Sequence, residues 1–144
     1  MIALDTNILV HAHRREASLH EPANKTVKDL AESMRPWCIC LHSLIEFYGI
    51  ATHPNIWREA SSPEQAFRQI HVWRSAPSLR ILGDSAQLLE SLQSITSAAK
   101  IQGPMIHDAR IVACCLSNGI KELWTVDRDF SRFPDLKTRN PLVG

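Results

Sequence analysis

Short apolar runs alternate with longer amphipathic segments along the chain, and this alternation constrains the fold more than any other feature of the sequence. The runs lie at residues 2–4, 37–41, 79–82 and 123–126. Runs this short and this apolar are typical of buried strands. Strands that alternate with helical segments form βα units around a mostly parallel sheet. We therefore predict an α/β fold with a central sheet of about four to five strands flanked by helices.

Helical spacing of apolar residues and local stop signals predict the segments between these strands. Pro36 ends the helix predicted over residues 22–34, and Ser62-Pro63-Glu64 begins the helix predicted over residues 62–73. Gly119 follows the helix predicted over residues 105–118, where a C-terminal glycine is expected. No internal repeat or linker-like stretch interrupts the chain, so residues 1–144 are expected to form one domain. A helix is expected to follow the turn at Asp5-Thr6-Asn7, and further predicted helices cover residues 22–34, 43–51, 62–73, 84–100 and 105–118.

Composition bears on where such a protein works. The apolar runs are far shorter than the roughly 20 residues needed to span a bilayer. The N-terminus reaches Asp5 without a basic region, unlike a secretory signal. The cysteine pairs Cys38/Cys40 and Cys114/Cys115 lack C-x-x-C spacing and lie in apolar segments, which predicts buried free thiols. We therefore expect no membrane contact and a cytoplasmic, reducing location.

The net charge of +1 provides no global basic field for nucleic acid. If the partner is RNA, attraction must come from local patches. A solvated surface is the alternative interpretation for each candidate basic residue. These candidates are Arg14, Arg15, Arg128, Arg132, Lys137 and Arg139.

Four acids occupy comparable positions in the predicted pattern. Asp5 ends the first strand, and Glu46 lies in the first turn of the helix after the second strand. Asp108 lies in the first turn of the helix after Gly103-Pro104, and Asp127 follows the fourth strand. In a parallel α/β sheet, strand carboxyl ends and helix N-termini share the edge where ligands bind. The four acids are therefore expected to converge there.

Each acid also has a structural interpretation. Asp5 and Asp127 could cap the segments that follow them, and Asp108 could complement a helix N-terminus. Glu46 completes an S-x-x-E capping box with Ser43. Four caps, however, need not share one edge of a sheet. The common placement therefore favours a functional site.

Clustered carboxylates repel one another, so such a site raises some pKa values or recruits a cation. Oxygen ligands without Cys or His at metal-ligand spacing point to Mg²⁺ or Mn²⁺. Such an ion activates water for phosphoryl chemistry, and no nucleophilic side chain is then required. His107 beside Asp108 could contact phosphate, although a supporting or surface role is the simpler interpretation.

At these residues the sequence resembles the PIN domain, particularly the VapC toxins of bacterial toxin–antitoxin modules. The likeness extends from residue 4 to residue 142, and the motifs occur in order and with matching spacing. The matching segments are Leu4-Asp5-Thr6-Asn7, Ser43 to Glu46, His107-Asp108-Ala109, Thr125 to Phe130, Phe133 to Leu136 and Asn140-Pro141-Leu142.

The resemblance implies a Mg²⁺- or Mn²⁺-dependent endoribonuclease that acts on single-stranded or loop RNA and leaves a 5′-phosphate and a 3′-hydroxyl. It makes Asp5 and Asp108 the principal metal ligands, with Glu46 and Asp127 completing the acidic ring. Asp129 matches an auxiliary acid, and Thr6 and Asn7 match polar residues beside the first acid.

The resemblance also implies a homodimer and a cognate antitoxin that binds near the active site. The segments 47–57 and 66–73 carry apolar residues at helical spacing, including Trp57 and Trp73. Their apolar faces could form such contacts or could simply belong to the core. Tryptophan is enriched at interface hot spots, which favours the first interpretation.

Three alternatives remain open at this stage. The chain could be a PIN nuclease of RNA processing or quality control, or a catalytically silent PIN domain that serves as a binding module. It could also be a receiver-like regulatory module. Receivers, however, need a lysine at the end of a late strand, whereas the fourth strand here ends in Thr125-Val126-Asp127. They also normally have a paired acid soon after the first strand, where this chain has Asp5 alone. The intact set of acids argues against the silent domain.

Overall fold

The computed structural model describes residues 1–143, in which five parallel strands form one sheet with the order β3-β2-β1-β4-β5. This result confirms the predicted α/β class. The short strand β5 is polar, so no apolar run in the sequence predicted it. The strands are β1 (Ile2–Leu4), β2 (Trp37–Cys40), β3 (Leu79–Leu82), β4 (Glu122–Trp124) and β5 (Lys137–Arg139).

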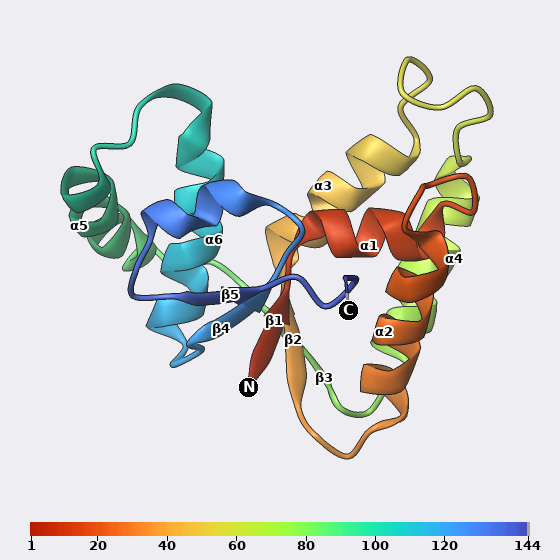
Figure 1. Ribbon diagram of the computed structural model, residues 1–144, viewed down its shortest axis with the longest axis horizontal. Coiled ribbons are helices and arrows are strands. Elements are labelled where there is room, and N and C mark those ends of the chain that lie inside the picture. Colours follow the sequence, from red (N-terminus) through yellow and green to blue (C-terminus); the bar gives the residue numbers. More distant parts are fainter. Residues whose placement is uncertain (144) are drawn as a thin grey trace.

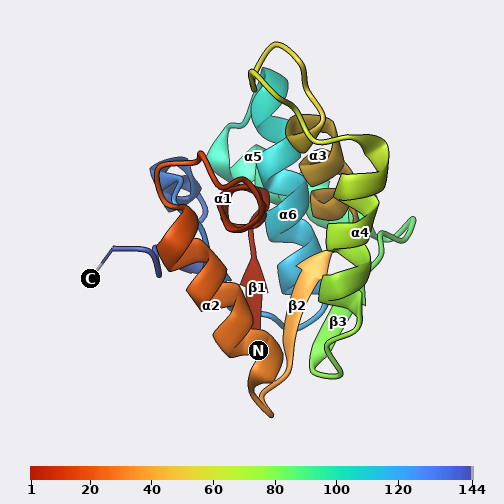
Figure 2. The ribbon, with the colours of Figure 1, turned by 90° about the vertical axis from the view of Figure 1, so that its right-hand side faces the viewer.

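Helices cover both faces of the sheet, so the fold has three layers (Figures 1 and 2). On one face lie α1 (Thr6–His13), α2 (His20–Glu32), α3 (Leu41–Ala51) and α4 (Pro63–Arg74). On the other lie α5 (Leu88–Ala99) and α6 (Ile106–Ser117), with the short 3₁₀ helices η1 (Gly103–Met105) and η2 (Arg128–Arg132) nearby.

The central strands are short but buried on both faces, and successive side chains enter opposite cores. Leu4, Trp37 and Ile39 pack with α1–α4. Ala3, next to Leu4 in β1, and Cys38, between Trp37 and Ile39 in β2, pack on the other face with α6. The two cores therefore fix the register of β1 and β2, and with it the edge of the sheet at which each strand ends.

Several helix boundaries differ from those predicted. Helix α2 ends at Glu32, because Ser33 adopts extended backbone, and Met34 is 96% exposed instead of lying on the buried face. Helix α5 begins only at Leu88, and Asp84, which was expected to start this helix, instead forms an ion pair with Arg110. Phe67 of α4 lies on the solvent side of the predicted apolar stripe, with 52% of its surface exposed.

The predicted capping box of Ser43 and Glu46 is wrong. Strand β2 runs directly into α3 with Cys40 as the N-cap residue, so Ser43 lies within the helix. Glu46 therefore lies in the second turn of α3, which corrects its predicted place in the first. The Ser43 hydroxyl is buried and has no hydrogen-bond partner among residues 1–143. A capping box does form at α4, where Ser62 and Gln65 bond reciprocally.

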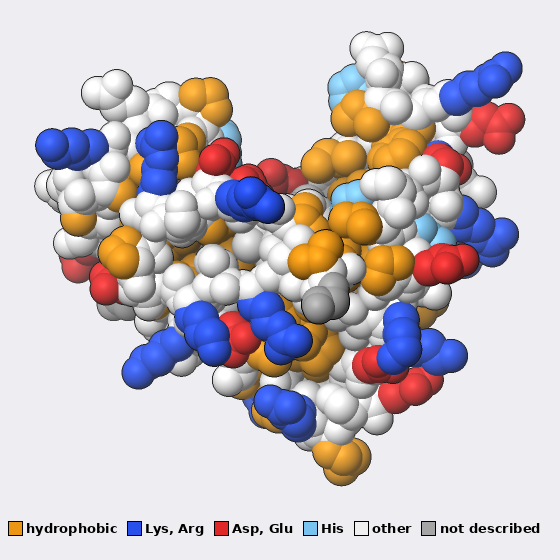
Figure 3. Space-filling view, viewed as in Figure 1, with side chains coloured by type: hydrophobic (Ala, Val, Ile, Leu, Met, Phe, Trp, Pro, Cys, Tyr) orange, Lys and Arg blue, Asp and Glu red, His pale blue; other side chains and the backbone are white. Residues whose placement is uncertain are grey.

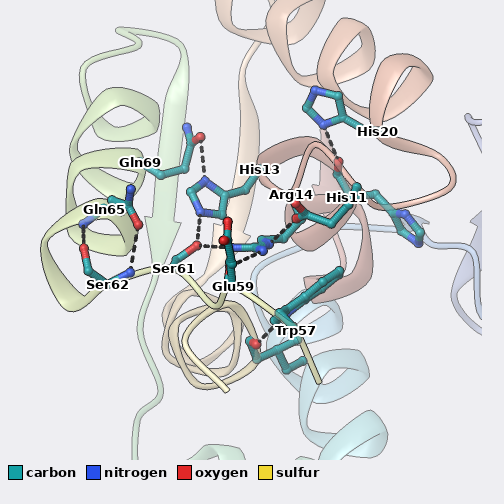
Figure 4. A network of polar contacts seen from close by, with 12 residues as sticks. His11, His13, Arg14, His20, Trp57, Glu59, Ser61, Ser62, Gln65 and Gln69 are labelled. Carbon is teal, nitrogen blue, oxygen red and sulfur yellow. Dashed lines mark hydrogen bonds and ion pairs between the residues drawn. The ribbon is translucent and has the colours of Figure 1, made fainter. Parts of the chain in front are cut away.

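A buried polar network ties the loop before α4 to the end of α1 (Figure 4). The Arg14 guanidinium donates to Ser61 Oγ at 2.8 Å and to the Glu59 carbonyl at 2.6 Å, and it lies 4.6 Å from the centre of the Trp57 ring. His13 bonds the same Ser61 hydroxyl through Nε2 at 2.8 Å. Arg14 is therefore a buried structural residue, which corrects its prediction as part of an RNA-attracting surface patch.

Two expectations from composition can be compared with the structure. All four cysteines are buried and free, as predicted. Within residues 1–143, no helix combines the length and the apolar character needed to cross a membrane.

The position of Ser43 predicts the effect of its removal. Ser43→Ala deletes a buried hydroxyl without a partner, so the free energy of unfolding should stay unchanged or rise by about 1 kcal/mol. Ser62→Ala is the matched control, because loss of a genuine cap should lower this free energy by about 1 kcal/mol. Urea unfolding of both variants measures the difference. A Ser43→Ala loss equal to that of Ser62→Ala would contradict this account.

Candidate active site

The structure places the predicted acids at the carboxyl edge of the sheet, around the starts of α1, α3, α6 and η2 (Figure 1). Asp5 directly follows β1, and Asp127 precedes η2. Glu46 lies on α3 and Asp108 in the first turn of α6. In the space-filling view a notch separates the α5–α6 side from the α3–α4 side, with acidic side chains at its floor (Figure 3).

Asp5 is the most enclosed of these acids, with 5% of its surface exposed. Its Oδ1 accepts a hydrogen bond from the Thr6 backbone amide at 2.7 Å, so it also caps α1. Its Oδ2 accepts from Thr125 Oγ1 at 2.7 Å and from Asn7 Nδ2 at 3.2 Å. The carboxylate is therefore fixed by groups from both α1 and the end of β4.

The predicted auxiliary residues Thr6 and Asn7 connect the acids to one another. Thr6 Oγ1 donates to Glu46 Oε1 at 3.2 Å. Asn7 Nδ2 donates to Thr125 Oγ1 at 3.1 Å, and Asn7 Oδ1 accepts from the Val126 amide at 3.4 Å. These bonds join α1 to α3 on one side and to the β4 end on the other.

Sequence reasoning gave no role to Thr125, which the structure makes the centre of this network. Thr125 is 3% exposed. Its hydroxyl donates to Asp5 and accepts from the Asp127 backbone amide at 3.0 Å. One side chain therefore helps to position both the Asp5 carboxylate and the backbone of Asp127. A polar residue closing an apolar strand two positions before an acid was the available signal.

The remaining acids are more open. Asp127 Oδ1 accepts from the Asp129 amide at 2.8 Å, which realises the capping role considered for it. Asp108 is half-buried, whereas Glu46 and Asp129 are exposed. His107 is also exposed at the start of α6, and its charge acts on Asp108.

Burial and, to a smaller extent, mutual repulsion raise the pKa values of two of these acids. Burial raises the pKa of Asp5 to about 6; the hydrogen bonds from Thr125 and Thr6 oppose the rise, and the charges of Asp108 and Glu46 add to it. Burial also raises the pKa of Asp108, with further contributions from the charges of Asp127, Asp129 and Glu46. These acids therefore act on one another electrostatically, although they come from four separate segments.

Fixed positive charge does not offset this repulsion. Among the ion pairs of residues 1–143, none involves Asp5, Asp108, Asp127 or Asp129. Arg110, two residues after Asp108, bonds instead to Asp84. Arg128, which lies between Asp127 and Asp129, takes part in none of these ion pairs. His42 Nε2 lies 3.5 Å from Glu46 Oε1, but burial lowers the pKa of this ring to about 4, so it is neutral near pH 7.

The donors available at the notch fit a hard divalent cation. They are carboxylate oxygens that lack compensating charge, the chemistry that Mg²⁺ and Mn²⁺ prefer. Within residues 1–143, no three His, Cys, Asp or Glu side chains are already gathered closely enough to hold an ion. Carboxylates that repel one another at the floor of the notch fit a site whose ligands move together when a cation binds.

Comparisons with known proteins agree with this geometry. The sequence model described as the PIN domain matches residues 2–136. Ribonuclease VapC48 of Mycobacterium tuberculosis is 26% identical over 140 residues, which cover 97% of this chain and 97% of the relative. The alignment therefore spans nearly the full length of both proteins.

Two solved structures share the fold. Mycobacterium tuberculosis VapC20, described as a sarcin–ricin loop cleaving toxin, has a TM-score of 0.68 and 19% identity, covering 91% of this chain and 93% of its own. VapBC2 from Rickettsia felis, bound to a DNA fragment from its promoter, has a TM-score of 0.69 and 21% identity, covering 96% and 98%.

The raised pKa of Asp5 predicts a pH-dependent stability difference. Because the folded-state pKa lies above its ordinary value of 3.8, its stabilising contribution is complete below about pH 3.8 and is lost as the pH rises through about 6. Asp5→Asn abolishes this loss. Its free energy of unfolding relative to wild type should therefore increase by about 2 kcal/mol between pH 4.5 and 7.5.

Urea unfolding in EDTA at the two pH values measures this change. Asp29→Asn, on the exposed side of α2, is the matched control and should show no such increase. A pH-independent difference between Asp5→Asn and wild type would show that the Asp5 carboxyl is not destabilised by its surroundings.

Proposed function

This chain belongs to the PIN domain family, and on that premise we propose that it is a Mg²⁺- or Mn²⁺-dependent endoribonuclease, the toxin of a type II toxin–antitoxin system. The observation that carries the proposal is the cluster of mutually repelling carboxylates at the notch, which lacks cationic side-chain partners among residues 1–143. Relatives along the full chain length are named VapC ribonucleases, which supports the assignment.

Asp5 and Asp108 would be the principal ligands of the cation, with Glu46, Asp127 and Asp129 completing the acidic ring. When bound there, a divalent ion supplies Lewis-acid chemistry that lowers the pKa of water and neutralises charge on the phosphodiester. The pKa of Asp5, about 6, leaves its carboxyl mostly ionised near neutral pH and therefore able to bind.

The side chains around the acids provide orientation. Thr125 and Asn7 hold Asp5 Oδ2, and Thr6 holds Glu46 Oε1. The attacking water gives a proton to solvent and forms a bond to phosphorus as the bond to the 3′-oxygen breaks. The departing 3′-oxygen takes up a proton from solvent, which leaves a 5′-phosphate and a 3′-hydroxyl.

Protein partners are part of the proposal. The solved toxin–antitoxin complexes of similar fold support a cognate antitoxin. A homodimer is part of the proposal only because the sequence resembles the VapC toxins. The segments considered for such contacts divide in the structure. Phe47 and Trp73 belong to the core, whereas Ile56, Phe67 and Val72 are exposed and available to a partner.

Cleavage of RNA tests the enzymatic assignment. Wild-type protein free of antitoxin should cut total RNA at discrete positions with Mg²⁺ or Mn²⁺ and not with EDTA. Asp5→Asn removes one charge at nearly constant shape and should lower the rate at least about a hundredfold, since changes even behind a metal site cost 10–100-fold. Mapping the cut ends by primer extension identifies the substrate.

Asp29→Asn controls for the loss of an aspartate elsewhere and should cleave like wild type. Unchanged cleavage by pure, folded Asp5→Asn would contradict the assigned site. Absence of cleavage by folded wild-type protein that binds Mn²⁺ would favour a silent binding module. A small antitoxin reading frame directly upstream would separate the toxin from a nuclease of RNA processing.

A further inference from the structure

His42, in the first turn of α3, is a buried polar side chain without a bonding partner. Only 4% of its surface is exposed, and neither ring nitrogen has a hydrogen bond within residues 1–143. Most buried polar side-chain atoms in proteins are bonded, because an unbonded one loses its hydration without compensation. The position of this ring therefore calls for an explanation.

The nearest acceptor for the ring is Glu46, one turn further along the same helix. The spacing of four residues places the two side chains on one face. His42 Nε2 lies 3.5 Å from Glu46 Oε1, just outside hydrogen-bonding geometry. The same oxygen accepts the hydrogen bond from Thr6 at 3.2 Å. A small rotation of either side chain would give Oε1 a second donor.

We propose that His42 is a positioning residue for Glu46. Its Nε2–H donates to Oε1 alongside Thr6, and this pair of donors leaves Oε2 directed into the notch as a cation ligand. The inference rests on the proposed function, because it assigns Glu46 to a cation. It does not depend on titration of the ring, since Nε2 carries a proton in one neutral tautomer and in the charged form.

Positioning matters more for Glu46 than for Asp5. Asp5 is short, buried and held by hydrogen bonds from three groups. The Glu46 side chain is longer and 42% exposed, and Thr6 is its only hydrogen-bond partner within residues 1–143. Ligating carboxylates are usually oriented by hydrogen bonds from behind. His42 is the buried group in position to supply the missing one.

The alternative is that His42 only fills space. Its charged and titratable neighbours include Arg110 and His107 from α6 and Asp84 from the connection between β3 and α5. Arg110 Nε donates to Asp84 Oδ2 at 2.7 Å, and a second guanidinium nitrogen contacts the same oxygen, so this arginine is already engaged. A space-filling ring would tolerate any replacement of similar volume, whereas a donor requires an N–H at the Nε2 position.

Three substitutions separate these roles. The amide nitrogen of His42→Gln can reach the Nε2 position, that of His42→Asn only the Nδ1 position, and His42→Leu provides neither. Mn²⁺ affinity is measured by calorimetry on the whole protein without RNA, after urea unfolding has shown each variant to be folded. We expect His42→Gln to bind within about threefold of wild type. His42→Asn and His42→Leu should bind about 10–100-fold more weakly.

A second background tests whether the effect acts through Glu46. In Glu46→Gln the carboxylate is already lost, so adding His42→Leu should weaken Mn²⁺ binding by less than about threefold more. Equal affinities of wild type and His42→Leu would overturn the proposal. Equal losses in His42→Gln and His42→Asn, or a full further loss in the Glu46→Gln background, would also overturn it.

Failure of the proposed function has a different signature. Absence of RNA cleavage with the expected pattern of Mn²⁺ affinities overturns the nuclease assignment and leaves the role of His42 supported. If wild type binds no Mn²⁺, both the nuclease assignment and the cation role of Glu46 are overturned. Nitrogen-15 NMR of the metal-free protein then tests the bond itself, for which a proton on Nε2 is expected and a neutral ring protonated on Nδ1 excludes donation to Glu46.

Discussion

The candidate site depends on one constraint, the burial of the Asp5 carboxylate where β1 ends. The side chain cannot move towards solvent without losing bonds to the Thr6 amide, Asn7 and Thr125. Through Thr125 it is linked to the end of β4, which is paired in parallel with β1. The sheet register therefore determines which further acids face Asp5, and Asp127 follows two residues after Thr125 on the same strand end.

Burial and like charge both oppose ionisation of this cluster. Hydrogen bonds offset part of the cost at Asp5, and yet its pKa still rises to about 6. Arg110, the arginine two residues after Asp108, is committed to Asp84, and no Lys or Arg within residues 1–143 forms an ion pair with the clustered acids. Such a site is most stable when a ligand supplies the positive charge. Repulsion between the carboxylates also explains why no three of them within residues 1–143 lie close enough to hold an ion.

Much of this arrangement could be predicted from sequence. The apolar runs of β1, β2 and β3 were sufficient to place the strands, and parallel pairing then sends Asp5 and Asp127 to one edge. The bonds of Thr125 and Arg14 and the burial of His42 were not predicted, because each depends on segments far away in the sequence. Thr125 bonds a residue 120 positions earlier, and Arg14 bonds one 47 positions later. His42 is enclosed by groups from α6 and from the connection after β3.

Capping and a place at the acidic notch, treated as alternatives in the sequence, coincide in the structure. Asp5 caps α1 and Asp127 caps η2, and both lie at the acidic notch. In a parallel sheet the residue that ends a strand often begins the next helix, so a cap and a ligand can be the same side chain. Glu46 had the strongest capping signature, yet it caps nothing, because β2 enters α3 without a loop. Evidence for a cap at a strand end is therefore no evidence against a functional acid there.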